Sequence, residues 1–270
     1  MNDNKLEYLE TKMTEPGSKD YEKIQELLKN DKKLVPQFWV NKYKNEASKN
    51  WYIISIQRRE FNELSFNNDD QDSKSRDKRI AVLELGCGVG NFIFPVLDAN
   101  PLLFVYACDF SKRAIDFSHA QYDETRCNAF VCDLTKDNLS DFIPSNDNID
   151  IVSSIFVLSS IPPEKHLNVI RNISKVTRQG SVICFRDYAI YDETQLKFSN
   201  DGTHKLDENL YVRQDGTMSY FFILEYLKDL FEKDKLFQMI SGEYVEKETI
   251  NRARELCVDR RFLQAKFIRL

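Results

Sequence analysis

The sequence has few histidines and no cysteine pair spaced for metal binding. It contains three histidines and six cysteines in 270 residues, and the cysteines fall mostly in apolar, strand-like runs without a Cys-x-x-Cys pair. This usage indicates neither a zinc site nor a disulfide framework. We therefore expect no metal, and we expect the cysteines to be small buried side chains in a reducing compartment.

Long hydrophobic runs and an excess of positive charge are also missing. No run reaches 18 apolar residues, and the first residues are polar and charged, so we expect no membrane association and a cytoplasmic location, with the nucleus as a second option. The net charge of −5 argues against general coating of nucleic acid. Residues 252–270 nevertheless carry six basic and two acidic side chains. Such a basic stripe can meet phosphates, although a solvated face is the more common explanation.

Composition and spacing predict three parts. With 42% hydrophobic residues, the chain can bury one sizeable core, which favours a single α/β domain with appendages. We expect residues 1–66 to form an N-terminal helical extension, because apolar and aromatic residues within 34–43 recur at spacings of three and four. Residues 67–79 are typical of a charged linker. Residues 80–270 form the main domain, with an insertion at about 189–218.

Short apolar strands alternate with helices from Ile80 onward. The spacing predicts strands at 80–85, 104–109, 128–132, 149–156 and 181–187, and helices from about 91, from Ser111 and over 163–177. Ser111 is a suitable N-cap, and Gly180 is expected to end the third helix. Past residue 188 we expect a long loop over 189–218, a helix over 222–235, and strands at 243–249 and 261–268 as an antiparallel end. The alternation implies a parallel sheet covered on both faces, with ligands at the carboxyl ends of its strands.

Residues 82–90 carry the most informative pattern, Val-Leu-Glu-Leu-Gly-Cys-Gly-Val-Gly. An apolar strand runs into Gly86, Gly88 and Gly90, which lets the backbone adopt positive φ and lie against a ligand where a helix begins. The third glycine of a dinucleotide fingerprint would fall at position 91, which is Asn91. A nicotinamide dehydrogenase is therefore disfavoured, and a ligand without a pyrophosphate is favoured.

Acidic residues end the next two strands. Asp109 follows the glycines by about 20 residues, where α/β nucleotide folds place the acid that binds ribose hydroxyls. Asp133 ends the third strand, the usual place for a group that meets an adenine amino group. The glycine turn and the two acids resemble the class I S-adenosylmethionine-dependent methyltransferases. That resemblance implies a Rossmann-like fold with a mostly parallel seven-stranded sheet, helices on both faces and an N-terminal helical cap.

Further motifs carry a more specific resemblance over roughly residues 34–268. They are Gly86-Cys-Gly-Val-Gly-Asn91, Ala107-Cys-Asp-Phe-Ser111, Cys132-Asp-Leu-Thr-Lys-Asp137, Ile155-Phe-Val-Leu-Ser159, Phe185-Arg-Asp-Tyr188, Tyr211-Val-Arg-Gln-Asp-Gly-Thr217, Ser219-Tyr-Phe-Phe222 and Phe262-Leu-Gln264. Together they resemble the tRNA N3-methylcytidine methyltransferases, and most of all the type acting on cytidine 32 of serine tRNAs. The resemblance implies S-adenosylmethionine as cofactor, S-adenosylhomocysteine as product, the tRNA anticodon arm as substrate, and seryl-tRNA synthetase as a candidate partner.

The resemblance also assigns cofactor contacts. Trp39 and Tyr43 belong to a lid, Gly86 lies at the methionine end, Asp109 binds the ribose, Asp133 and Leu134 meet the adenine, and Ile155 lies near the sulfonium. Gly88, Gly90 and Phe110 are further predicted cofactor contacts. The segment between Tyr43 and Trp51 is shorter than is usual in this family. Substrate contacts from the missing residues are therefore not expected.

The chemistry of the acceptor suggests one catalytic side chain. Cytosine N3 has a free lone pair at neutral pH, so catalysis is alignment without a general base. The product ring is cationic, and a nearby carboxylate would stabilise the developing charge. Asp187, at the end of the fifth strand, is our hypothesis for this carboxylate. The alternative is an ion pair with its neighbour Arg186.

An extruded loop base would stack on aromatic rings. Tyr188, Tyr211 and Phe221 are candidates for stacking, and each is more readily explained as a core residue. Arg213 and Arg260 are better candidates for contacts with phosphates or bases. The predicted substrate-binding residues are Arg186, Tyr188, Arg213 and Arg260.

Two other functions fit parts of this pattern. A class I methyltransferase that acts on a protein or a small molecule would share the cofactor motifs, and its basic stripe would be incidental. A noncatalytic partner subunit with a methyltransferase fold is the second alternative. The intact Gly86, Asp109 and Asp133 argue against it.

Overall fold

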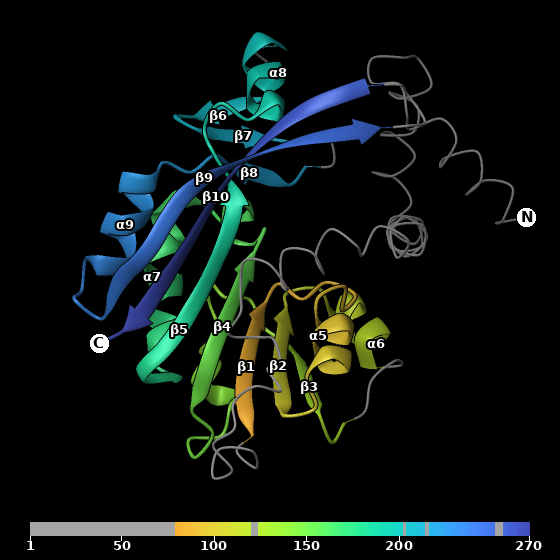
Figure 1. The fold of residues 1–270 in the computed structure, drawn as a ribbon, viewed down its shortest axis with the longest axis vertical. Coiled ribbons are helices and arrows are strands. Elements are labelled where there is room, and N and C mark those ends of the chain that lie inside the picture. The colour runs from red at the N-terminus through yellow and green to blue at the C-terminus, as the bar shows by residue number, and fades with distance from the viewer. Residues whose placement is uncertain (1–78, 120–123, 202–203, 214–215, 252–255) are drawn as a thin grey trace, which may run out of the picture. The chain divides into compact units, whose positions relative to one another are not determined.

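A computed structural model describes the main domain of the chain (Figure 1). The described residues are 79–119, 124–201, 204–213, 216–251 and 256–270. All of them belong to the unit formed by residues 57–270. The helical extension and nearly all of the linker expected from the sequence, together with Trp39 and Tyr43, lie outside the described residues.

A seven-stranded sheet forms the centre of the described domain, in the order β3-β2-β1-β4-β5-β10-β9. Its strands are β1 (Ile80–Leu85), β2 (Leu103–Asp109), β3 (Cys127–Val131), β4 (Ile149–Ile155), β5 (Thr177–Tyr188), β9 (Phe237–Asn251) and β10 (Leu256–Arg269). The first five strands are parallel, and β10 runs antiparallel to both β5 and β9. The mostly parallel sheet with an antiparallel end is thus confirmed.

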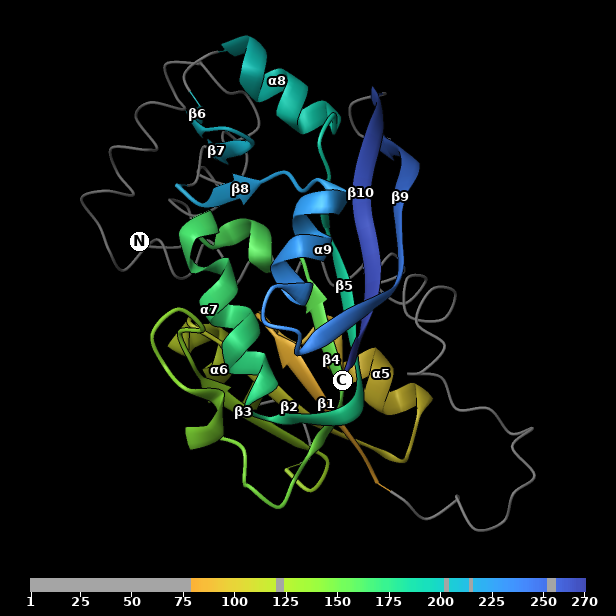
Figure 2. The ribbon, with the colours of Figure 1, turned by 90° about the vertical axis from the view of Figure 1, so that its left-hand side faces the viewer.

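Helices cover both faces of the sheet, which explains why its central strands are mostly apolar. The helices are α5 (Ile93–Ala99), α6 (Lys112–His119), α7 (Pro163–Ser174) and α9 (Leu224–Glu232). In Figure 1, α5 and α6 lie in front of the sheet and α7 lies behind it, as right-handed crossovers require. Figure 2 shows α9 beside α7 and against β9. Every residue of β1 after Ile80 is buried.

The insertion after β5 is folded, so the expectation of a long loop over 189–218 was wrong. It contains α8 (Glu193–Asp201), β6 (Lys205–Asp207), β7 (Leu210–Val212) and β8 (Met218–Tyr220). The three strands form a second sheet, in the order β6-β7-β8, beyond the carboxyl end of β5 (Figure 1). Strands of three residues are too short to show the alternation by which a strand is recognised in a sequence.

Gly180 does not end a helix, which corrects a second expectation. Helix α7 stops at Ser174 and β5 starts at Thr177, so Gly180 lies inside the strand with φ +87°. The pairing of β4 with β5 shifts register between Ile149 and Ile151, and a glycine with positive φ is typical of such an irregularity. Strands β9 and β10 also extend beyond the expected ranges, to Phe237–Asn251 and Leu256–Arg269.

Within the described residues we find neither a metal site nor a membrane-spanning helix. No group of three or more His, Cys, Asp or Glu side chains in this part of the chain is placed to hold a metal ion. Within the same residues, no helix has the length and apolarity needed to cross a membrane. Cys87, Cys108, Cys127, Cys132 and Cys184 are buried free thiols.

Candidate active site

The carboxyl ends of β1, β2 and β3 meet at one edge of the sheet. The backbone N–H of Cys87 donates to Cys108 O, and that of Cys132 donates to Asp109 O, both at 2.9 Å. These bonds connect each strand end to its neighbour. They bring the glycine turn after β1 next to Asp109 and Asp133, which the sequence predicted to act together.

Two glycines in the turn after β1 have different reasons to lack a side chain. Gly86 and Gly88 have φ of +60° and +53°. A Cβ on Gly86 would lie 2.7 Å from a methyl carbon of Val157, whereas a Cβ on Gly88 would meet nothing within 4 Å. Gly86 is therefore packed against the segment after β4, and Gly88 faces open space in which a ligand can approach the backbone. Gly90 also has positive φ, of +86°.

Asp109 fixes the turn and keeps hydrogen-bonding capacity for a ligand. Its carboxylate accepts the N–H of Gly88 at 2.9 Å and that of Ser111 at 2.8 Å. Burial raises the pKa of Asp109, and these two bonds act in the opposite direction. Each oxygen retains a lone pair, so the carboxylate can accept two ribose hydroxyls. Phe110, the next residue, is 78% exposed and presents an aromatic ring beside it.

Asp133 takes part in a tight local turn. Its carboxylate accepts the N–H and the hydroxyl of Thr135 at 3.0 and 2.7 Å, and it pairs with Lys136 at 2.7 Å. The Lys136 ammonium and the Thr135 hydroxyl lower the pKa of Asp133. Leu134, predicted to line the adenine, is buried. The adenine-binding role of both residues stays a prediction.

A buried acid next to the turn was missed by the sequence reasoning. Glu84 is buried in β1, directly beside Ser153 in β4. Among the described residues, Glu84 Oε2 and Ser153 Oγ have no hydrogen-bond partner, and burial, followed by the charge of Asp109, raises the pKa of Glu84 well above its usual value. Buried polar atoms without partners are costly, so this pair fits the polar methionine end of a cofactor. The sequence feature that could have indicated this site is the single acidic residue, Glu84, within an otherwise apolar strand.

Asp187 ends β5 and is completely buried. Its carboxylate accepts the N–H groups of Ser159 and Tyr188, each at 2.9 Å. Burial raises the pKa of Asp187 to about 6, while hydrogen bonds from Ser159 lower it. Arg186 lies on the opposite face of the strand and donates to Gln264 at 2.6 Å. This placement directs Arg186 away from Asp187.

A buried histidine holds the turn that contacts Asp187. This 3-10 turn, η4 (Leu158–Ser160), follows β4. His166 Nε2 lies 2.9 Å from the carbonyl oxygens of both Leu158 and Ile161, and its Nδ1 lies 3.0 Å from the hydroxyl of Tyr226. Burial lowers the pKa of His166. A neutral ring that donates from Nε2 and accepts at Nδ1 satisfies all of these contacts, and it keeps the N–H of Ser159 directed at Asp187.

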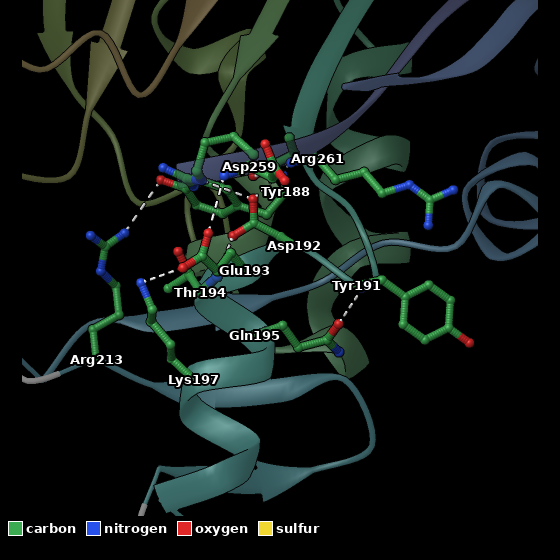
Figure 3. Close-up of polar contacts among 12 residues, drawn as sticks. Tyr188, Tyr191, Asp192, Glu193, Thr194, Gln195, Lys197, Arg213, Asp259 and Arg261 are labelled. Atoms are coloured by element: carbon green, nitrogen blue, oxygen red, sulfur yellow. Dashed lines mark hydrogen bonds and ion pairs between the residues drawn. The ribbon is translucent and has the colours of Figure 1, made fainter. Parts of the chain in front are cut away.

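An aromatic cluster, formed by Phe156, Tyr188 and Phe262, follows Asp187 in the chain but lies on the opposite face of β5, the face that carries Arg186. The ring centroid of Phe156 is 5.1 Å from that of Tyr188 and 5.5 Å from that of Phe262. Arg213 Nη1 donates to the Tyr188 hydroxyl at 3.3 Å (Figure 3). The Arg260 guanidinium lies 5.4 Å from the Tyr188 ring and 5.3 Å from the Phe262 ring. All four predicted substrate residues thus meet at this cluster, because the buried Arg186 guanidinium also lies 4.9 Å from the Phe262 ring.

The other two candidates for stacking are core residues. Tyr211 and Phe221 are 4% and 1% exposed, and their rings pack edge to face at 5.5 Å. The basic stripe is also divided, because neighbouring residues of a strand point to opposite faces. Arg260 faces the aromatic cluster, whereas Arg261 lies 4.3 Å from the ring of Tyr244.

Comparison with known proteins identifies the family. A family model described as a methyltransferase domain matches residues 83–183. The chain is 44% identical over 259 residues to the tRNA N(3)-cytidine methyltransferase METTL6 of Homo sapiens, which covers 91% of this chain and 88% of the relative. The chain belongs to the tRNA N(3)-cytidine methyltransferase family. The tRNA N(3)-methylcytidine methyltransferase trm141 of Schizosaccharomyces pombe is 40% identical over 244 residues, with coverage of 87% and 98%.

As a member of this family the protein is a methyltransferase, and S-adenosylmethionine is its methyl donor. A solved S-adenosylmethionine-dependent methyltransferase from Anabaena variabilis superposes with a TM-score of 0.60 at 15% identity, over 87% of this chain and 93% of that one. This likeness confirms the class I fold. The family predicted from the sequence motifs is confirmed as well.

Proposed function

We propose that this enzyme transfers the methyl group of S-adenosylmethionine to N3 of cytidine 32 in the anticodon loop of serine tRNAs. The observation that carries the proposal is a juxtaposition along one sheet edge. The glycine turn and Asp109 lie at the ends of β1 and β2, and the aromatic cluster with Arg213 and Arg260 lies at the ends of β4, β5 and the insertion. The choice of position 32 and of serine tRNAs rests on the family resemblance of the FRDY and YVRQDGT motifs.

The donor half of the site is suited to a sulfonium cofactor. When bound, S-adenosylmethionine supplies an electrophilic methyl group. Asp109 would accept the ribose hydroxyls, and the open side of Gly88 would admit the ligand to the backbone. Glu84 and Ser153 would satisfy their unpaired oxygens on the amino-acid end, and Phe110 would cover the adenosine.

The acceptor half is suited to a single extruded pyrimidine. An unpaired loop base has less base pairing to lose than a base in a helix, and it can lie on the exposed side of the aromatic cluster. Arg213 and Arg260 provide positive charge for the flanking phosphates. The N3 lone pair would form a bond to the methyl carbon as the bond from that carbon to the sulfonium sulfur breaks, which would leave S-adenosylhomocysteine as a neutral thioether and a positively charged ring. No general base is needed. Asp187 is ionised above its pKa of about 6. Its negative charge stabilises the positive ring, and the interaction is stronger because the buried surroundings have a low dielectric constant.

Methylation of defined tRNA transcripts by the purified protein tests this proposal. We expect N3-methylcytidine in digested serine tRNA, detected by mass spectrometry of nucleosides, and none in a transcript with uridine at position 32. Methylation that persists in the uridine variant would refute the assigned position. Label from the donor found only in protein or in small molecules would support the other methyltransferase class.

We also propose seryl-tRNA synthetase as a partner that presents the tRNA. The support is the family resemblance, together with the net charge of −5, which limits nonspecific attraction to RNA. Adding the synthetase should lower the KM for serine tRNA and leave other tRNAs unaffected. An unchanged KM would remove the partner from the proposal without affecting the reaction.

A further inference from the structure

A buried carboxylate in the insertion contacts one of the two arginines of the aromatic cluster. Asp192 is 0% exposed. One oxygen accepts Arg260 Nε at 2.8 Å and the Arg261 N–H at 2.9 Å, and the other accepts the Thr194 N–H at 2.9 Å. Figure 3 shows Asp192 at the centre of these contacts, where α8 begins. Asp192 therefore joins the first turn of α8 to β10.

The turn that leads into α8 is held in a conformation that directs Asp192 inward. Tyr191 has φ of +65°, which is unfavourable for a large side chain and persists only where neighbouring contacts impose it. Its N–H donates to Gln195 Oε1 at 2.6 Å, the Asp192 N–H donates to Ala189 O, and the Ala189 N–H donates to Arg261 O. The ring of Tyr191 remains 65% exposed, so burial of that ring does not explain the strained backbone. The conformation does place the Asp192 carboxylate beneath Arg260.

The ion pair determines where the Arg260 guanidinium lies. An arginine side chain has many rotamers, and ordering it on binding costs free energy. Asp192 uses only Nε of Arg260, so the contact leaves Nη1 and Nη2 for a phosphate or a base. The same contact keeps the guanidinium over the rings of Tyr188 and Phe262.

The second arginine reaches the cluster from another part of the insertion. Arg213 follows β7 and donates to the Tyr188 hydroxyl, whereas Arg260 comes from β10 and lies over the Tyr188 ring. The two arginines thus approach one aromatic ring from segments that are far apart in sequence. Their spacing depends on how the insertion docks against β10, and Asp192 forms a buried contact across that junction.

We propose that Asp192 is a positioning residue for RNA binding, which holds Arg260 in place on the aromatic cluster before the tRNA arrives. This inference rests on the proposed function. It predicts an effect on the tRNA, through Arg260, and none on the cofactor. Asp192 does not touch substrate in this role.

The test compares Asp192→Asn with Glu193→Gln. Glu193 is a matched control, because it also connects α8 to β10, by accepting the Asp259 N–H at 3.1 Å, yet it does not contact Arg260. We expect Asp192→Asn to raise the KM for tRNA by about 3- to 10-fold, the range for ordering one long side chain. Its kcat and its affinity for S-adenosylhomocysteine should stay within twofold of the wild type. Glu193→Gln should leave all three values unchanged.

A double-mutant cycle with Arg260→Gln separates positioning from general structural support. If Asp192 acts through Arg260, adding Asp192→Asn to Arg260→Gln should raise the KM no further. An equal additional increase, or a loss of cofactor affinity, would overturn the proposal. Should Asp192→Asn fail to fold, Arg260→Lys keeps the charge but loses the Nε contact, and an unchanged KM in that variant would equally overturn it. A wild-type enzyme that makes no N3-methylcytidine would instead refute the proposed function.

Discussion

The donor and acceptor halves of the site lie along the same sheet edge but are built differently. The donor half uses strand ends and backbone atoms, with its residues between Glu84 and Leu134 and connected by bonds between neighbouring strands. The acceptor half uses side chains from β4, β5, the insertion and β10, from Phe156 to Phe262. The comparison shows that cofactor binding depends on one local arrangement, whereas substrate binding depends on how distant segments dock.

The largest effect should come from removing the carboxylate of the donor half. Asp109→Ala deletes the acceptor for the Gly88 and Ser111 N–H groups and for the ribose. Because hydrogen bonds to a charged group contribute about 1.5–3 kcal/mol each, we expect binding of S-adenosylhomocysteine to weaken by about 100-fold or more. Calorimetry measures this. Asp116→Ala, which removes an exposed pair with Lys112, is the control, and equal affinities in the two variants would contradict the assignment.

A smaller effect, confined to kcat, should follow Asp187→Asn. We expect a decrease of about 10- to 100-fold, because one preorganised charge near the reacting centre is lost. Burial raises the pKa of Asp187 to about 6, so wild-type kcat should fall as the pH drops through 6, and the Asn variant should lack this fall. Folding stability should have the opposite trend and decrease as the pH rises from the ordinary Asp value of 3.8 to about 6.

Asp150→Asn is the control for that pH profile. Asp150 also accepts a backbone N–H in the sheet, from Ala81 at 3.0 Å, but it lies at the start of β4, away from the site. Its substitution should leave the pH dependence of kcat unchanged. Identical profiles for the wild type and Asp187→Asn would dismiss the catalytic role of Asp187.

Substitution of two glycines with similar local properties separates an effect on cofactor binding from an effect on folding stability. A Cβ at Gly88 or Gly180 would meet nothing within 4 Å, and both residues have positive φ, so substitution by Ala should cost each about 1–2 kcal/mol of stability. Only Gly88 faces the expected ligand. We expect Gly88→Ala to weaken S-adenosylhomocysteine binding by about 10-fold, a free-energy change of about 1.4 kcal/mol, and Gly180→Ala to leave it unchanged. Equal affinities would mean that the cofactor does not lie over this turn.

The smallest effect should come from Arg213 in the acceptor half. Arg213→Ala removes a partly exposed cation, and we expect the KM for tRNA to rise about threefold to fivefold at low salt, and less at high salt because ions screen such contacts. Tyr188→Phe is the matched variant, since it removes the hydroxyl that Arg213 contacts and keeps both the ring and the charge. If Tyr188→Phe raises the KM as much as Arg213→Ala does, the effect comes from the orientation of the Arg213 side chain and not from its charge alone.

The donor half could be predicted from the sequence because its residues are close to strand ends in the chain. The glycine turn, Asp109 and the Ser111 cap, whose hydroxyl accepts the Ala114 N–H at 3.3 Å, all follow from local patterns. Glu84 could not be recognised in this way, because a single acid in an apolar strand does not show whether its side chain has a partner. Its burial and missing partner appear only when β1 is packed between its neighbours.

The acceptor half could be predicted only in part. The motifs pointed to Tyr188 and Arg213 and the basic stripe to Arg260, but the contacts among them depend on pairings between β5, β10 and the insertion that no local signal specifies. Asp192 was missed for this reason, since an acid before a helix is ordinarily only a cap. Tyr211 and Phe221 are aromatic residues of the motifs and suggest stacking, but the structure buries both.

The absence of a side chain at Gly86 has a consequence for the reaction trajectory. The Val157 methyl groups occupy the space that a Cβ would need, and Val157 directly precedes η4, whose Ser159 contacts Asp187. The contact between Gly86 and Val157 therefore sets the distance between the glycine turn and η4. A methyl group at position 86 would displace Val157 and the segment that leads to Ser159, so Gly86→Ala should lower kcat as well as weaken cofactor binding.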